Sequence, residues 1–254
     1  PPRPHARADA PASRHARHRP VGVQTRRSDP FLTLYPASAH PPQNIGATFE
    51  VLKKELANKG KKATNNRAGA LSAMRAMLSS KRDIAEPYVA ANLDVVIAAV
   101  ADKEKPVSIE ADLTAKALVA AMSPHALTKI LPAILAEGDG KWQANLLRSE
   151  LIGELAKSGA ARMGRALSTS DVVRVLSGLM WDTKPQVKAA ATESIKHVFA
   201  CDTNTDLKDY IPKVITCIEK PEAVPESVHE LAGVVFVQEV FGSSLALMAP
   251  LLKR

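Results

Sequence analysis

The stretch Met180-Trp-Asp-Thr-Lys-Pro-Gln-Val-Lys-Ala-Ala-Ala-Thr192 combines the end of one helix, a tight turn and the start of a second helix. Apolar residues recur at helical spacing on both sides of it, with Val173, Leu176 and Met180 before the turn and Val187, Ala191, Ile195, Val198 and Phe199 after it. Asp182 and Pro185 mark the turn, and Pro185 suits the first turn of a helix, where its missing N–H has no partner to lose. The stretch predicts a helical hairpin with one apolar face per helix, which cannot bury both faces alone.

The same pattern returns along the chain at steps of about 40 residues. The second-helix positions recur as Val107, Ala111, Ala115, Leu118 and Val119, then as Leu147, Leu151 and Leu155, and later as Val228, Leu231 and Val235. The first-helix positions recur as Leu93, Val96 and Val100, as Ile130, Ile134 and Leu135, and as Ile211, Ile215 and Ile218. An ordinary helical bundle has no reason to repeat in this way. We therefore predict an all-α fold, a HEAT/armadillo-like α-α superhelical solenoid of about five helical pairs.

Prolines and composition refine this prediction. We expect Pro87 to open the second pair, Pro132 and Pro212 to bend the first helices of their pairs, and Ser158–Ser170 to connect two helices. The 254 residues include only 12 glycines and 4 % aromatic residues, which favours closely packed helices over a β-sandwich or a nucleotide-binding α/β domain. No apolar run approaches the length that spans a membrane.

The two ends of the chain differ from the repeats. Residues 1–42 contain nine of the 18 prolines and seven arginines, with no lysine or glutamate, so we expect a disordered tail ahead of a solenoid over residues 43–254. A transit segment, an arginine-rich nucleic-acid arm and an artefact of gene prediction remain open. Residues 1–40 carry +5 of the whole-chain charge of +8, which weakens the charge as an indication of nucleic-acid binding. At the other end, Met248–Leu252 looks like a new repeat, so we expect a truncated solenoid.

Two groups of basic residues are candidates for contacts with nucleic acid. The first is the densest basic run of the predicted solenoid, and the second flanks Trp142 and Trp181, each beside a turn within a pair. Flexible lysines can neutralise phosphates, and turns aligned on one edge could offer aromatic and basic groups to RNA or to an acidic protein. Alternatively, the lysines are a solvated face and the indoles pack against neighbouring repeats. The candidate residues are Lys53, Lys54, Lys59, Lys61, Lys62, Arg67, Lys141, Lys184 and Lys188.

The sequence contains no recognisable catalytic or metal site. Gly138-Asp-Gly-Lys141 is too short for a phosphate-binding loop, and Cys201 and Cys217 lack a second pair of ligands, so we expect them to be free, buried thiols. The histidines of the predicted solenoid fall in separate repeats. We therefore expect no enzyme activity and no cofactor in this chain.

Several short motifs of the sequence resemble, in the same order, the N-terminal HEAT region of fungal-type translation elongation factor three. They are Glu86-Pro-Tyr88, Lys141-Trp-Gln143, Met180-Trp-Asp-Thr-Lys184, Val187-Lys-Ala-Ala-Ala-Thr192, Tyr210-Ile-Pro212, Val224-Pro-Glu-Ser-Val-His229 and Pro250-Leu-Leu252. The likeness covers about residues 45–254 and is specific because the motifs keep repeat spacing. This chain lacks the family's ATP-binding cassettes, and Pro185-Gln186 stands where that family usually has charged residues.

The resemblance implies the ribosome-docking arm of a cytoplasmic translation factor that acts in elongation. Its implied partners are the small-subunit RNA and proteins of the ribosome and other translation factors, with no membrane and a monomeric state. The full-length family protein uses ATP in its cassettes to help release tRNA from the exit site, so ATP is not a cofactor of this chain. Two alternatives are a HEAT scaffold of a general-control-type ribosome-associated regulator and a HEAT adaptor that binds proteins.

Overall fold

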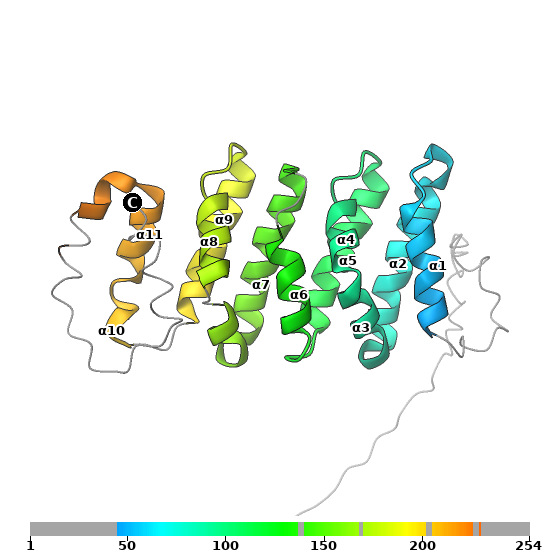
Figure 1. Ribbon diagram of the computed structural model, residues 1–254, viewed down its shortest axis with the longest axis horizontal. Helices are drawn as coiled ribbons and strands as arrows, with labels where there is room; N and C mark the ends of the chain where they lie inside the picture. Colours follow the sequence, from blue (N-terminus) through cyan, green and yellow to red (C-terminus); the bar gives the residue numbers. More distant parts are fainter. Residues whose placement is uncertain (1–44, 137–139, 168–169, 202–204, 226–228, 230–254) are drawn as a thin grey trace, which may run out of the picture. The chain divides into compact units, whose positions relative to one another are not determined.

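The computed structural model describes residues 45–136, 140–167, 170–201, 205–225 and 229, and no β-strand occurs among them (Figure 1). The α-helices are α1 (Ile45–Ala57), α2 (Thr64–Ser80), α3 (Arg82–Ala91), α4 (Leu93–Ala99), α5 (Lys105–Ala121), α6 (Leu127–Leu135), α7 (Trp142–Leu167), α8 (Ser170–Leu179), α9 (Pro185–Ala200), α10 (Thr205–Lys208) and α11 (Ile211–Glu219), with 3₁₀ turns η1 (Lys61–Ala63) and η2 (Pro221–Ala223). The all-α prediction is confirmed. The expectations for residues 1–42 and for the apolar positions from Val228 onward lie outside the described residues.

The helices form pairs that stack in two layers. The first helices α1, α4, α6 and α8 contact the second helices α2, α5, α7 and α9 of the same pairs. Each second helix also contacts the next one along the chain, α2 with α5, α5 with α7 and α7 with α9. Helix α11 contacts α9 and takes the place of the first helix in a fifth pair. This nearest-neighbour packing is that of a HEAT-repeat solenoid, as the repeat period predicts.

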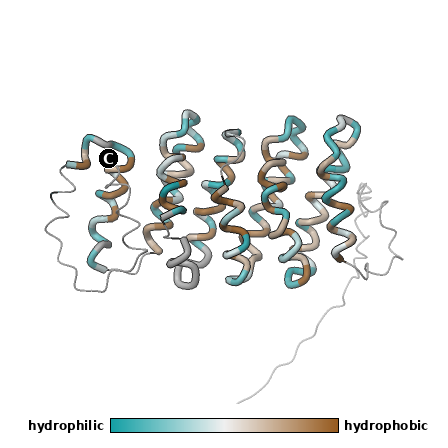
Figure 2. Tube along the Cα trace, in the orientation of Figure 1, coloured by the Kyte–Doolittle hydropathy of each residue, from teal (hydrophilic) through white to brown (hydrophobic). Residues whose placement is uncertain are grey.

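The core consists of the apolar positions that define the repeat. Val187, Ala191, Ile195, Val198 and Phe199 are fully buried on α9, and their counterparts on α5 are buried as well. Figure 2 shows hydrophobic segments along the helices and hydrophilic turns at the upper edge of the layers. Burial of apolar surface stabilises such an arrangement by about 25 cal/mol per Å², and here each pair gains it only from its neighbours.

Two predicted helix boundaries are wrong. Pro87 lies inside α3 and does not open the second pair, whose first helix is divided at Asn92 into α3 and α4. The Asn92 side chain donates a hydrogen bond to the carbonyl of Tyr88 at 2.8 Å, which satisfies a carbonyl near the end of α3. Helix α7 continues to Leu167 through the segment expected to connect two helices, because alanine, arginine and leucine there favour a helix.

The other prolines fit the helices in two ways. Pro106 lies in the first turn of α5 and Pro185 begins α9, where neither costs a helical hydrogen bond. Pro132 lies inside α6, as predicted, whereas Pro212 lies in the first turn of α11 and therefore removes no hydrogen bond from the helix interior.

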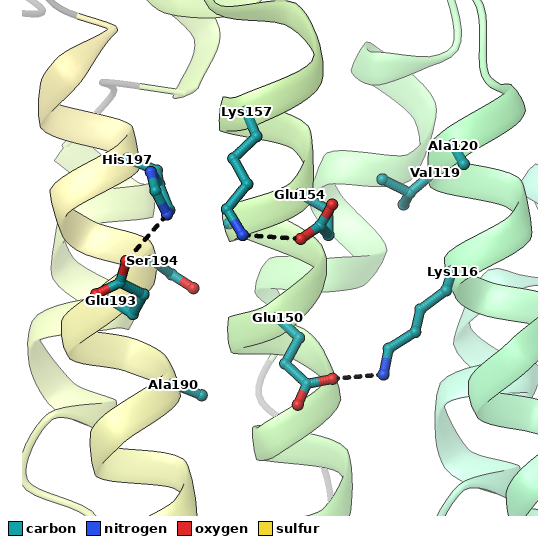
Figure 3. Close-up of a pocket in the computed structure, with 11 residues that line it drawn as sticks. Lys116, Val119, Ala120, Glu150, Glu154, Lys157, Ala190, Glu193, Ser194 and His197 are labelled. Carbon is teal, nitrogen blue, oxygen red and sulfur yellow. Dashed lines mark hydrogen bonds and ion pairs between the residues drawn. The ribbon is translucent and has the colours of Figure 1, made fainter.

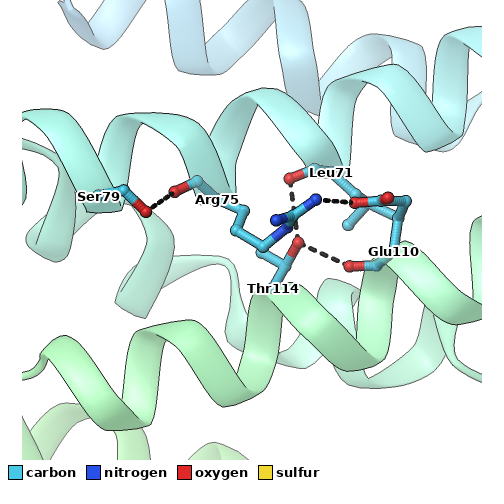
Figure 4. A network of polar contacts seen from close by, with 5 residues as sticks. All are labelled: Leu71, Arg75, Ser79, Glu110 and Thr114. Carbon is cyan, nitrogen blue, oxygen red and sulfur yellow. Dashed lines mark hydrogen bonds and ion pairs between the residues drawn. The ribbon is translucent and has the colours of Figure 1, made fainter.

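Buried hydroxyl groups join successive second helices. In Figure 4, the Thr114 hydroxyl on α5 lies 3.0 Å from the carbonyl oxygen of Leu71 on α2, and Arg75 forms an ion pair with Glu110 at 2.9 Å across the same interface. Eighty residues after Thr114, the Ser194 hydroxyl on α9 donates to the carbonyl of Ser149 on α7 at 2.6 Å. The same helix position therefore carries a hydroxyl that contacts a backbone carbonyl of the preceding second helix two repeats apart, which links the second helices.

Both cysteines are free and buried, as the sequence predicts. Burial raises the pKa of the Cys201 thiol, because loss of water disfavours the thiolate.

We expect the native protein to react with Ellman's reagent at least about tenfold more slowly than the urea-unfolded chain, since the thiols react only after local opening. The absorbance time course in both conditions measures this ratio, and equal rates would contradict the buried placement.

Candidate nucleic-acid interface

The turns within the helical pairs lie at one edge of the two layers, because each turn follows a first helix and the first helices run in the same direction (Figure 1). These turns comprise residues 58–63, 100–104, 140–141, 180–184 and 220–223. We refer to them together as the turn edge. Among the described residues, no helix is both long and apolar enough to cross a membrane.

Aspartates shape two of these turns in the same way. The Asp102 carboxylate accepts a hydrogen bond from the backbone N–H of Glu104 at 2.9 Å, and the Asp182 carboxylate accepts one from the N–H of Lys184 at 2.9 Å. Such a bond two residues along the chain is typical of an Asx turn. It stabilises the extended residue that precedes the second helix, so the aspartates that mark the sequence repeat also fix the shape of the turn edge.

The second oxygen of each aspartate contacts the preceding repeat. Asp102 forms an ion pair with Arg67 of α2 at 3.2 Å, and Asp182 accepts a hydrogen bond from the Asn145 amide of α7 at 3.3 Å. Arg67 is only 4 % exposed. The sequence analysis included Arg67 among the candidate nucleic-acid contacts. In the structure its guanidinium lies inside the solenoid and links two repeats, so Arg67 does not belong to the exposed basic surface.

A shallow pocket of about 430 Å³ lies between residues 140–143 and 181–184, in the third and fourth turns. Trp142 and Trp181 border this pocket and are 36 % and 47 % exposed. The indole N–H of Trp181 donates to the carbonyl of Ile218 at 3.2 Å, and the Lys188 ammonium lies 6.0 Å from the centre of a Trp181 ring. Trp181 therefore packs against the next repeat and still presents nearly half of its surface to solvent.

The two groups of candidate lysines lie along the same edge of the layers, one at the first turn and the other at the third and fourth turns (Figure 1). Lys59 and Lys62 lie in the α1–α2 turn, Lys61 begins η1, and Lys53 and Lys54 lie on the last turns of α1. Lys141, Lys184 and Lys188 lie at the third and fourth turns. Apart from Lys61, whose side chain is not described, all seven of these lysines are exposed.

The sequence analysis missed two further lysines of the turn edge. Lys103 is exposed in the α4–α5 turn, and Lys220 is exposed in the turn that follows α11. A signal for Lys103 was present, because it directly follows the turn aspartate Asp102. The repeat is marked by buried apolar positions, so exposed residues that recur between them carry a weaker signal.

The turn edge combines two properties that suit RNA. The carboxylates of Asp102 and Asp182 already accept internal hydrogen bonds, while neighbouring lysines extend into solvent. Ammonium groups neutralise backbone phosphates, and exposed indoles offer flat surfaces on which unpaired bases stack. The arrangement can therefore hold a single-stranded or looped nucleic acid without reading a long sequence.

Comparison with known proteins identifies the family. Residues 42–195 match a family described as "EF3 N-terminal HEAT repeat". The chain is 36 % identical to elongation factor 3 of Gonapodya prolifera over 192 residues, which cover 74 % of this chain and 17 % of that protein. It is 35 % identical to elongation factor 3 of Candida albicans over 210 residues, or 81 % of this chain and 20 % of that protein.

A more divergent relative gives the same result. Elongation factor 3 of Phytophthora infestans is 31 % identical over 217 residues, which cover 83 % of this chain and 20 % of that protein. The chain thus spans about a fifth of the length of these relatives, and the match falls on a HEAT region rather than on an ATPase cassette. Together with the observed solenoid, these matches show that the chain belongs to the elongation factor 3 family, as its N-terminal HEAT-repeat region.

Proposed function

We propose that this chain is the ribosome-docking module of an elongation-factor-3-like translation factor and that it contacts small-subunit RNA through the turn edge. The observation that carries the proposal is that Trp142, Trp181, Lys141 and Lys184 line one pocket on the turn edge. The relatives of this chain are named as elongation factors, which supports a role in translation. The module itself performs no chemistry. It acts in the cytoplasm as a monomer, and ribosomal proteins and other translation factors complete its set of partners.

The proposal assigns different roles to the module and to the full-length protein. ATP hydrolysis and release of exit-site tRNA would belong to cassettes of the full-length factor, whereas this region would supply affinity and orientation on the ribosome. A stack of repeats suits that role, because it spaces its binding groups along an edge that is fixed by packing. Several weak phosphate contacts along such an edge add up to useful affinity without a deep pocket.

The third and fourth turns provide the sharpest test. Replacing both Lys141 and Lys184 with glutamine removes two ammonium groups, so we expect about a tenfold loss of affinity for purified small ribosomal subunits at moderate salt. The slope of log affinity against log salt should fall by roughly 1.5, because each lost phosphate contact removes about 0.7 to 0.9 from it. Co-sedimentation across a salt series measures both quantities.

A matched control has the same change in net charge. The Lys129→Gln/Lys208→Gln variant alters exposed lysines near the start of α6 and at the end of α10, at the opposite ends of the pairs from the turn edge. We expect it to bind as the unaltered chain does. Equal losses in both variants, or binding of the unaltered chain that is indifferent to salt, would show that the turn edge does not dock on ribosomal RNA.

A further inference from the structure

A second hollow lies away from the turn edge, on the layer of second helices. It is a groove of about 700 Å³ between α5, α7 and α9, shown in Figure 3. Small residues on these three helices line it, namely Ala120, Gly153, Ala190 and Ser194. Short side chains at these positions let α7 and α9 approach closely and leave space above them, so the repeat sequence itself creates the groove.

The charged side chains of the groove carry an excess of negative charge. Three carboxylates, those of Glu150, Glu154 and Glu193, line it together with two ammonium groups, those of Lys116 and Lys157, and the imidazole of His197. Lys116 bridges α5 and α7 through an ion pair with Glu150 at 2.7 Å, so this carboxylate is compensated inside the structure. Glu154 and Glu193 remain the most accessible carboxylates, with side chains that are 53 % and 60 % exposed.

The internal partners of these two glutamates are easily displaced. Glu154 pairs with Lys157 at 3.0 Å, and Glu193 pairs with His197 at 3.2 Å and with Lys196 at 3.5 Å, each within a single helix. Exposed ion pairs of this kind contribute only about 0 to 1 kcal/mol. A cationic ligand could therefore replace the internal partners at little cost.

Apolar side chains extend the groove along α5. Ile109 and Leu113 are 48 % and 41 % exposed, which is unusual for large aliphatic residues. They lie one helical turn apart, and the same helical face continues through Lys116 to Ala120 in the groove. An exposed aliphatic pair beside half-exposed carboxylates, whose internal partners are displaceable, suits a polypeptide, because RNA offers no aliphatic side chains and its phosphates gain nothing from the carboxylates.

We propose that this groove binds a basic amphipathic segment of a partner protein, with its arginines or lysines at Glu154 and Glu193 and its aliphatic side chains against Ile109 and Leu113. The choice of occupant rests on charge complementarity together with the exposed aliphatic pair. The proposal goes beyond RNA docking, since it concerns a different layer of the molecule and a different class of partner. The module would then have two separate surfaces, a basic edge for RNA and an acidic groove for protein.

The test uses a fluorescent peptide in which arginine and leucine alternate, titrated with the whole chain and followed by anisotropy. We expect the Glu154→Gln/Glu193→Gln variant to bind it about tenfold more weakly, because two charge pairs are lost without a change in side-chain shape. Leu113→Ser should weaken binding about threefold through loss of aliphatic contact. The same peptide with glutamate in place of arginine should not bind.

Two controls separate this proposal from general electrostatics and from the RNA proposal. The Glu50→Gln/Glu219→Gln variant removes two exposed carboxylates outside the groove and should bind the peptide normally. The Lys141→Gln/Lys184→Gln variant should bind RNA about tenfold more weakly and keep peptide binding. Equal losses in the Glu50/Glu219 control, unchanged binding in the Glu154/Glu193 variant, or competition between peptide and RNA would overturn the proposal, and circular dichroism establishes that each variant is folded.

Discussion

Replacing Asp102 with alanine is expected to lower the free energy of unfolding by about 3 kcal/mol. The Arg67 side chain is only 5 % exposed, and both of its terminal nitrogens contact the Asp102 carboxylate, at 3.2 and 3.3 Å. Removal of the carboxylate would leave a guanidinium buried without its counter-charge, which costs far more than the net value of the pair. Urea unfolding followed by circular dichroism measures the loss.

The equivalent aspartate two repeats later provides a matched control. Asp182 makes the same backbone hydrogen bond in its turn, but its partner on the preceding repeat is the neutral amide of Asn145. We expect Asp182→Ala to cost only about 1 kcal/mol, the value of ordinary hydrogen bonds. The difference between the two variants isolates the buried charge, and similar costs would mean that Arg67 reaches water in the Asp102 variant. Adding Arg67→Met to Asp102→Ala should recover part of the loss.

The second large effect is expected at Gly153, where alanine should destabilise the protein by about 2 kcal/mol although alanine is the better helix former. A Cβ at this position would lie 2.6 Å from the Ser194 hydroxyl oxygen and 3.3 Å from its Cβ. The hydroxyl cannot easily move away, because it is held by the 2.6 Å hydrogen bond to the Ser149 carbonyl. The substitution therefore forces α7 and α9 apart, and thermal unfolding measures the cost.

Gly178 tests the opposite sign. It lies in α8, and an added Cβ there meets no atom within 4 Å. Gly178→Ala should stabilise the protein by about 0.5 to 1 kcal/mol through the lower backbone entropy of the unfolded chain.

For the Gly153 prediction, combining Ser194→Ala with Gly153→Ala should regain stability, since the second substitution removes the nearest clashing atom. A stabilising Gly153→Ala would show that the two helices separate without strain.

The sequence alone determined the helices and their stacking. Apolar residues such as Val187, Ala191 and Ile195 recur at helical spacing within a unit, and the units recur along the chain. The helical spacing and the spacing of the repeats together decide which side chains are buried. The all-α solenoid and most of its core residues could therefore be predicted from the sequence. Helix boundaries were harder to predict, as Pro87 shows, because a single proline removes only one backbone donor and can lie inside a short helix.

The tertiary structure alone decided which charged residues belong to the surface. In sequence, Arg67 looks like one more member of a basic run. In the structure, Arg67 lies on the side of α2 that faces Asp102 of the next repeat, and its side chain is buried there. Gly153 and Ser194 likewise carry no signal until α7 and α9 are packed together. The physical reason is that the periodicity of the sequence specifies which face of each helix is apolar. Contacts between polar side chains one repeat apart depend instead on the packing distance between the helices, which the sequence pattern does not give.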